Sequence, residues 1–465
     1  MTPARPTTRL AALLAAALAA ALLPALAQEP PPAAPQTDQQ KIEELEQRLK
    51  VLERKDELAK EEAAAKEKEA PKVSIGKDGF SVRSADGAYQ MKIRGYLHVD
   101  SRFFDGTPED VIDYTDNLIL RRARIVLEGT VAKYFEYKLM PDFGEGKTVL
   151  QDAYVDVKLA PEFRIRVGKY KPPVGLERLQ SANDIYFVER ALPTNLVPNR
   201  DIGIMLHGEV SDGVFGYQVG VFDGSADGAN IDTDTNDYKD FAARLSVQPF
   251  RKTSLFGLQG LFFAVAGTYG NNLGGTISAT GLSAYRSAGQ VPFFTYRVGA
   301  TTAATTIADG LRTRFTPQAY WNYGRFGVEA EYVASRTDVR RGSDTARLES
   351  TAWEVTAAVM LTDDVSSWKG VSPKKPFDLK ARQWGAVELA VRRDRLSTDP
   401  DAFPIFANPE VSAQAASEWG AGINWYFNRN FRWMVDACRT TFRGGAVEGD
   451  RPRELVYLNR FQISW

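Results

Sequence analysis

The feature that most limits how this chain can fold is a two-residue alternation of apolar and polar side chains, repeated in segments of about ten residues from residue 72 onward. In QMKIRGYLHVDSRF (90–103), Met91 and Ile93 share one face, whereas Lys92 and Arg94 share the other. This period is that of a β-strand with one apolar face. About ten residues is also the length that a tilted strand needs to cross a bilayer, whereas strands of soluble sandwiches are usually shorter. The pattern therefore predicts an all-β protein, a transmembrane antiparallel β-barrel.

We predict about 16 strands from the alternating segments. Their ranges are 90–103, 117–131, 134–142, 149–159, 163–170, 201–210, 214–222, 239–248, 258–270, 311–322, 326–336, 350–362, 384–395, 417–427, 431–442 and 453–465. Alternate connections are short turns, while the intervening ones, such as 171–200 and 271–310, are mostly long. Bacterial barrels show this asymmetry, with short periplasmic turns and longer outer loops. The connections 143–148 and 363–383 fit less well, so the prediction allows for one hairpin more or fewer.

The last predicted strand ends on an aromatic residue. Phe461, Ile463 and Trp465 lie on its apolar face. In outer-membrane barrels generally, such an end resembles the signal that the barrel-assembly machinery reads, so we expect this machinery as a partner. The outward apolar face of the barrel implies contact with outer-membrane lipid and lipopolysaccharide.

The residues before the barrel have a different character. Residues 1–27 combine a positively charged start, a long apolar run and small residues at the end, which predicts a cleaved signal peptide and export. Residues 28–40 form a Pro- and Gln-rich linker, and residues 41–70 a periplasmic helix with two apolar heptads. We expect a short coiled coil, with a solvated single helix as the alternative. The barrel domain follows at 72–465, in the outer membrane.

No residue pattern predicts an enzyme, a cofactor or a metal site. Cys438 is the single cysteine, which excludes an intrachain disulfide. His98 and His207 lie on different predicted strands, as polar residues facing the lumen. FGEGKTV (143–149) ends like a phosphate-binding loop, but Pro141 stands where such a loop needs its first glycine. We expect no catalysis and no nucleic-acid partner.

Several stretches carry a resemblance to a known family. They include GFSVRSADGAYQMKIRGYLHVDSRFF, RRARIVLEG, the closing VYLNRFQISW, and above all Val167 to Gly208, which combines a Pro-Pro turn with a long loop. In these the sequence resembles the phosphate-selective porin O and P family. The resemblance implies a homotrimer of 16-stranded barrels, each with its own pore, and passive flow of small solutes with anions such as phosphate preferred. The family's phosphate-selective members guide the anion along an arginine ladder to a lysine-rich constriction; this chain has an arginine-rich wall but no clear lysine cluster in its loops.

The loop 171–200 is the third outer loop, which commonly folds into 16-stranded porins and narrows them. The predicted constriction residues are Lys169, Lys171, Arg178, Arg190 and Arg200. The predicted basic pore-wall residues, which the alternation turns inward, are Lys92, Arg94, Arg102, Arg122, Arg124, Arg164, Arg166, Arg244, Arg312 and Arg314. Acidic residues of the third, fourth and eleventh strands also turn inward, so the two signs are segregated by strand. Basic groups in a narrow passage favour anions; the alternative is that the charges of the loop pair within it.

Two functions of different classes fit these features. The first is an outer-membrane porin whose water-filled channel passes small solutes by diffusion, with a preference for anions. The second is a structural outer-membrane anchor, a barrel plugged by its long loops with a coiled coil that faces the cell wall. Ion conductance separates the two hypotheses, because a plugged barrel conducts no ions.

Overall fold

The computed structural model describes residues 37–76, 79–105, 114–232 and 236–465. The chain divides into two compact units, one up to Glu69 and one from Ala70 to Trp465. The predicted signal peptide and most of the predicted linker lie outside the described residues.

The first unit contains a single described helix, α1, which spans Asp38–Glu69 and so begins three residues before the predicted helix. Strong helix formers fill it, and ion pairs one turn apart, such as Arg48 with Glu44, support it weakly. Leu45 and Leu49, at heptad positions, are 64% and 57% exposed in the single chain. None of the described helices is long and apolar enough to cross a membrane.

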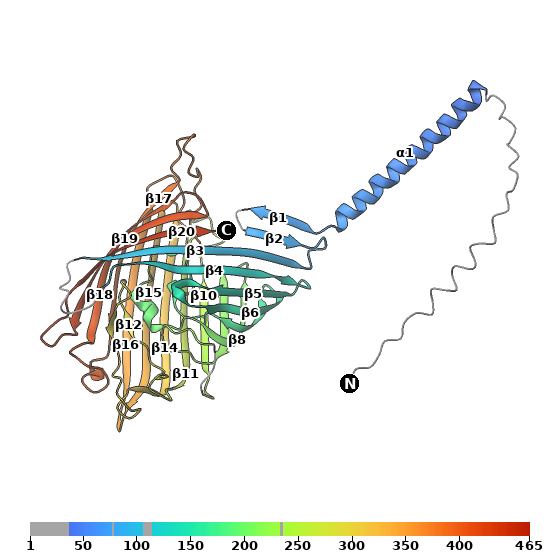
Figure 1. Cartoon of the computed structure of the whole chain (residues 1–465). Helices are drawn as coiled ribbons and strands as arrows, with labels where there is room; N and C mark the ends of the chain where they lie inside the picture. The colour runs from blue at the N-terminus through green and yellow to red at the C-terminus, as the bar shows by residue number, and fades with distance from the viewer. Residues whose placement is uncertain (1–36, 77–78, 106–113, 233–235) are drawn as a thin grey trace, which may run out of the picture. The chain divides into compact units, whose positions relative to one another are not determined.

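The second unit is a closed antiparallel β-barrel (Figure 1). Its sixteen strands are β3 (Gln90–Phe104), β4 (Asn117–Val131), β5 (Phe135–Asp142), β6 (Val149–Ala160), β7 (Phe163–Tyr170), β8 (Asp201–Val210), β9 (Phe215–Phe222), β10 (Asp240–Val247), β11 (Leu261–Leu273), β14 (Ile307–Tyr323), β15 (Phe326–Arg341), β16 (Asp344–Met360), β17 (Ala386–Ser397), β18 (Ala413–Tyr426), β19 (Phe431–Gly444) and β20 (Glu454–Ser464). The smaller elements are β1 (Lys72–Gly76), β2 (Gly79–Arg83), β12 (Tyr285–Arg286), β13 (Pro292–Phe294), α2 (Leu176–Leu179) and the 3-10 helices η1 (Gly144–Gly146), η2 (Leu192–Leu196), η3 (Phe256–Leu258) and η4 (Pro400–Ala402). The predicted fold and the predicted sixteen strands are confirmed.

The barrel closes where its last strand meets its first. β20 pairs with β3 from Val456 opposite Phe104 to Ser464 opposite Tyr96. Beyond the strand, Trp465 and Gly95 exchange two backbone hydrogen bonds of 3.0 and 3.1 Å. The hairpin of β1 and β2 pairs with the first residues of β3, before this seam begins. Closure removes the free edges that an open sheet would expose in a bilayer.

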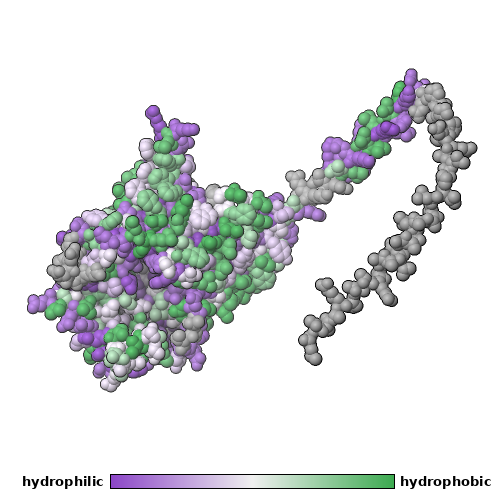
Figure 2. Space-filling model, in the orientation of Figure 1, coloured by the Kyte–Doolittle hydropathy of each residue, from purple (hydrophilic) through white to green (hydrophobic). Residues whose placement is uncertain are grey.

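The alternation along each strand separates a polar interior from an apolar exterior. On β17, Val391 is half exposed on the outside, while Arg392 next to it is 1% exposed inside. On β18, Trp419 faces outward and Glu418 inward. Figure 2 shows hydrophobic residues over much of the visible outer surface of the barrel. This is the arrangement of a barrel wall that contacts lipid.

Two strands extend further than the alternation of apolar residues predicts. The predicted ends at residues 336 and 350 left a long loop, whereas β15 and β16 continue to a tight turn at Gly342, whose φ is 61°. Ion pairs replace apolar residues on this extension, with Arg347 bonded to Asp338 at 2.6 Å. On the inner side of the extension Val339 and Leu348 are buried, so the apolar residues change from the outer to the inner face, and the alternation of the barrel wall could not predict the extension.

The connection between β7 and β8, residues 171–200, folds into the barrel and is called loop 3 below. It contains α2 and η2, and several of its apolar side chains, including Val174, Leu176 and Ile185, are fully buried. Val174 belongs to a hydrophobic cluster with inward-facing apolar side chains of the wall, such as Phe222 and Val333. Loop 3 is therefore an ordered part of the barrel interior.

Candidate functional site

A cavity of about 1330 Å³ lies inside the barrel, between loop 3 and the inner face of β3 to β8. The connections between β5 and β6, β9 and β10, β11 and β14, and β16 and β17 also contribute to its lining, as do residues of β9 and of the segment from β18 to the end of the chain. Fifteen lysines or arginines and six aspartates or glutamates line it among the described residues. The excess of basic groups is surprising, because the chain as a whole carries a formal net charge of −1.

Loop 3 is held against the opposite side of the barrel by carboxylates of the wall. The backbone N–H of Leu176 donates to Glu331 on β15 at 2.7 Å. The N–H of Leu192 donates to Asp394 on β17 at 3.2 Å, and a third such bond joins Val188 to Asp436 on β19. The acidic side of the wall is thus the attachment surface of the loop.

This attachment removes the acidic side of the wall from the cavity. Glu329, Glu331, Glu354 and Glu388 point inward, as the alternation predicts, but each is at most 3% exposed. None of the four belongs to the described lining of the cavity. Loop 3 therefore covers the acidic wall of β15 to β17 and leaves the wall of β3 to β8 facing the open space.

Three of the predicted constriction residues line the cavity and bond only to backbone carbonyl groups within the described residues. Lys171 donates to the carbonyls of Leu179 and Gln180 at 3.3 and 2.8 Å. Arg178 donates to Thr194 at 2.6 Å, and Arg190 to Glu177 and Gln180 at 3.0 and 2.9 Å. A carbonyl group orients a cation without cancelling its charge, so these positive charges are not neutralised by an ion pair.

Burial has different consequences for these three groups. Burial, with the charges of neighbouring arginines, lowers the pKa of Arg178 to about 9; burial lowers that of Arg190 to about 10. Both therefore stay protonated at neutral pH. Burial and the charges of Arg200 and Arg190 lower the pKa of Lys171 well below its usual range. Arg178 and Arg190 therefore hold a positive charge more strongly than Lys171 does.

The other two predicted constriction residues stand at the roots of loop 3, and each has a carboxylate partner. Arg200 lines the cavity and bonds to Asp152 of β6 at 2.8 Å. Lys169 is 3% exposed, pairs with Asp232, and is not part of the lining.

The predicted wall residues divide into two groups. Arg94, Arg122, Arg124 and Arg166 line the cavity, whereas the other six do not. Seven of the ten form ion pairs; the pairs are Arg94–Glu128, Arg124–Asp142, Arg164–Asp156, Arg166–Asp156, Arg312–Asp240, Arg314–Asp227 and Arg102–Glu189. Arg244 bonds to Gln318 instead, and no ion pair of Lys92 is found among the described residues. Four of these pairs join neighbouring strands, Arg312 reaches Asp240 across β11, and these partners of Arg314 and Arg102 lie in loops.

Arg122 differs from the other wall arginines of the cavity. Within the described residues its single hydrogen bond is to Nδ1 of His98, at 3.3 Å, and no carboxylate pairs with it. His98 in turn bonds to Asn183 of loop 3 at 2.8 Å. Arg122 therefore presents a positive charge to the cavity that no ion pair cancels.

Arg121 is a lining residue that the alternation assigned to the outside of the barrel. The pairing of β3 with β4 shifts between His98 opposite Arg122 and Val99 opposite Leu120, which leaves Arg121 as the extra residue of a β-bulge. A bulge lets two consecutive side chains turn to the same side. The sequence feature that indicates this bulge is the pair Arg121-Arg122 itself, because strict alternation would place one of the two arginines in lipid.

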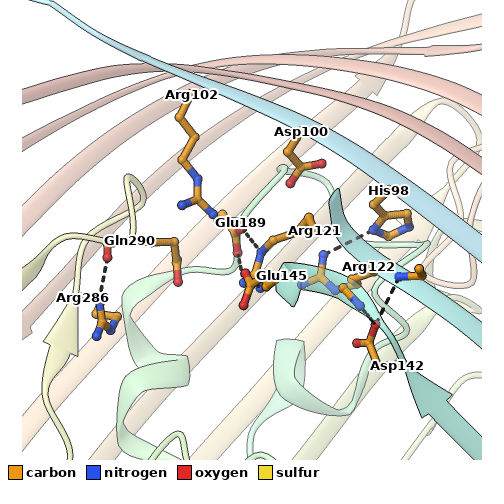
Figure 3. A network of polar contacts seen from close by, with 12 residues as sticks. His98, Asp100, Arg102, Arg121, Arg122, Asp142, Glu145, Glu189, Arg286 and Gln290 are labelled. Carbon is orange, nitrogen blue, oxygen red and sulfur yellow. Dashed lines mark hydrogen bonds and ion pairs between the residues drawn. The ribbon is translucent and has the colours of Figure 1, made fainter. Parts of the chain in front are cut away.

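Arg121 bonds to Glu189 of loop 3, at the centre of a network of charges (Figure 3). Its Nε lies 2.7 Å from one carboxylate oxygen of Glu189, and a terminal nitrogen lies 3.2 Å from the other. Burial acts to raise the pKa of Glu189, but the charge and hydrogen bonds of Arg121 outweigh it and hold the pKa well below its usual range. Glu189 is therefore ionised. Its place in this network could not be predicted, because a loop has no side-chain period.

Comparison with known proteins agrees with this architecture. The model of the family described as phosphate-selective porin O and P matches residues 91–462. Porin O of Pseudomonas aeruginosa is 23% identical over 394 residues, which covers 76% of this chain and 83% of that protein. An uncharacterised protein of Aquifex aeolicus is 32% identical over 108 residues, 21% of this chain and 26% of the other.

Solved structures show the same fold at low sequence identity. In-vitro folded OmpT of Vibrio cholerae matches with a TM-score of 0.51 and 12% identity, over 81% of this chain and 98% of that chain. The outer-membrane channel DcaP of Acinetobacter baumannii matches with a TM-score of 0.51 and 8% identity, over the same shares.

Proposed function

Because this chain belongs to the phosphate-selective porin O and P family and forms a closed barrel of the outer membrane, we propose that its channel prefers small anions, phosphate or similar ions among them. The protein is a porin, and porins are channels rather than enzymes. The alternative of a plugged structural anchor is not favoured, since the family consists of porins.

The observation that carries the proposed preference is the covering of the acidic wall by loop 3. The cavity is left with basic residues in excess, among them Arg178 and Arg190, for which the described part of the chain provides no ion pair. A charge exposed to bulk solution is screened within about 8–10 Å at ordinary salt concentrations, but a confined passage with low-dielectric walls is screened less. Cations held there attract anions and replace part of their hydration shell.

The test is the reversal potential of single channels between unequal potassium chloride solutions. The double variant Arg178→Gln/Arg190→Gln should lower the chloride-over-potassium permeability ratio by roughly three- to tenfold, because two unneutralised charges leave the passage. The matched control is Arg336→Gln/Arg347→Gln, which removes two arginines of the β15–β16 hairpin outside the cavity lining. An unchanged ratio in the first variant, or an equal change in both, would contradict the proposal.

The assembly is also a proposal. Leu45 and Leu49 on α1, exposed in one chain, support a coiled coil between copies, and hence a homotrimer of the kind the family resemblance implies. The outward side chains of Phe461, Ile463 and Trp465, each between 44% and 49% exposed, support contact with lipid, lipopolysaccharide and the barrel-assembly machinery.

A further inference from the structure

The arginines around Glu189 come from separate strands and meet at one carboxylate of loop 3 (Figure 3). From one oxygen of Glu189, the nearest nitrogen of Arg121 on β4 lies at 2.7 Å, that of Arg102 on β3 at 3.4 Å, and that of Arg460 on β20 at 4.0 Å. Glu189 itself is 3% exposed. Arg121, Arg122 and Glu189 all belong to the lining of the cavity, so this cluster borders the path of the ions.

The cluster holds more positive than negative charge. Arg460 pairs with Asp100 through two bonds of 2.7 and 2.6 Å, and Arg121 is shared with Glu145 at 2.5 Å. Arg102 has no carboxylate besides Glu189 among the described residues, and its buried Nε has no hydrogen-bond partner. Without the charge of Glu189, Arg102 would lose its single ion pair within the described residues.

A guanidinium group binds a carboxylate and the oxygens of a phosphate in the same forked geometry. We propose that Glu189 is a specificity-determining residue, a tethered anion that fills an oxyanion-binding site formed by Arg102 and Arg121, with Arg460 next to them. This inference rests on the proposed anion channel. A channel must bind its ion weakly enough to release it, and three convergent arginines in a confined space bind a divalent oxyanion strongly. The carboxylate of Glu189 occupies these arginines, so that anions pass along the cluster without being retained.

Loop 3 does not depend on this side chain for its position. The carbonyl group of Glu189 accepts a bond of 2.9 Å from Arg392 on β17. On either side, the N–H groups of Val188 and Leu192 are held by Asp436 and Asp394. Replacing the carboxylate by an amide of the same shape therefore removes a charge and leaves the backbone anchors in place.

The experiment measures the block of chloride current by inorganic phosphate in channels of the full-length protein in planar bilayers, at neutral pH. The variant Glu189→Gln should be half-blocked at a phosphate concentration at least tenfold lower than the wild-type channel. Glu145→Gln is the matched control, because it removes one carboxylate that also contacts Arg121 while Glu189 stays in place. Its half-blocking concentration should fall by less than threefold. Adding Arg102→Gln to Glu189→Gln should restore the wild-type value.

An unchanged half-blocking concentration in Glu189→Gln, or an equal decrease in Glu145→Gln, overturns the proposal. If Glu189→Gln fails to yield a heat-modifiable barrel, Glu189→Asp replaces it. The shorter side chain of aspartate lies farther from Arg102, so the half-blocking phosphate concentration should be two- to threefold lower than in wild type. An unchanged half-blocking concentration in this variant overturns the proposal. Wild-type reversal potentials are recorded in the same bilayers; a wild-type channel without anion preference contradicts the proposed function, whatever phosphate does to the variants.

Discussion

Asp184 of loop 3 lines the cavity and is the acidic lining residue whose charge should change near neutral pH. Burial raises its pKa to about 6, although Arg432 and Lys171 act in the opposite direction. The carboxyl group is therefore mostly neutral at pH 5 and mostly ionised at pH 7. Since ionisation adds a negative charge to the passage, we predict that the chloride-over-potassium permeability ratio decreases by about twofold between these pH values.

Reversal potentials at several pH values check this prediction. The variant Asp184→Asn should keep the ratio of pH 5 throughout the range, while Asp227→Asn, which removes another lining carboxylate, should retain the pH dependence. The same pH dependence in Asp184→Asn and in the wild type would assign the titration to another group.

The sequence predicted individual site residues only where strand periodicity applies. Arg94, Arg122 and Arg124 follow from alternation, because a regular strand turns every second side chain to the lumen. Arg121 does not, because the bulge that turns it inward depends on the pairing partner. Glu189 lies in a loop without a period, and its contacts with β3, β4 and β20 exist only once the barrel has closed.

The seam between β20 and β3 is the element on which closure depends, and Gly95 is its most crowded point. A Cβ at this position would clash with the ring of Trp465 and lie 2.8 Å from the carbonyl oxygen of Arg124. We predict that Gly95→Ala destabilises the barrel by about 1–3 kcal/mol, as expected when a methyl group is forced into a packed site. The measurement is the denaturant midpoint at which the barrel loses its heat-modifiable mobility.

Gly76→Ala serves as the control, because a Cβ there would meet no atom of the described residues within 4 Å. Equal midpoints for the Gly95 and Gly76 variants would mean that the seam adapts to the added methyl group.

The elements differ in how far the sequence determines them. Most strands were predictable within a few residues, because lipid outside and polar groups inside impose a strict alternation on every strand that crosses the membrane. The ends of β15 and β16 were not predictable in this way, because these strands continue into water. There, ion pairs such as Arg347–Asp338 take the place of outward apolar side chains. The inward fold of loop 3 was expected from the family resemblance alone.

At the scale of the whole molecule, α1 and the barrel are separate compact units, so each can be removed without cutting into the other. We predict that deleting residues 28–70 leaves a conducting channel with unchanged ion preference, because the described lining residues of the cavity all belong to the barrel unit. The oligomer should dissociate at a lower temperature on semi-native gels, because the exposed stripe around Leu45 and Leu49 is lost.

The control for this prediction is the full-length variant Leu45→Asp/Leu49→Asp, which should lower the dissociation temperature to a similar extent. Complete loss of channels on deletion would show that α1 is required for barrel formation, and an unchanged dissociation temperature would exclude a coiled coil between copies.

The covering of the acidic wall by loop 3 has a consequence for how such a channel changes over evolution. Both signs of charge are built into the sixteen strands, and a single loop decides which of them the permeating ion meets. A relative with the same wall but a loop folded against the basic side would expose Glu329, Glu331 and Glu354 and favour cations. Changes confined to the thirty residues from 171 to 200 would thus reverse the sign of the preferred ion, while the barrel wall that contacts lipid stays the same.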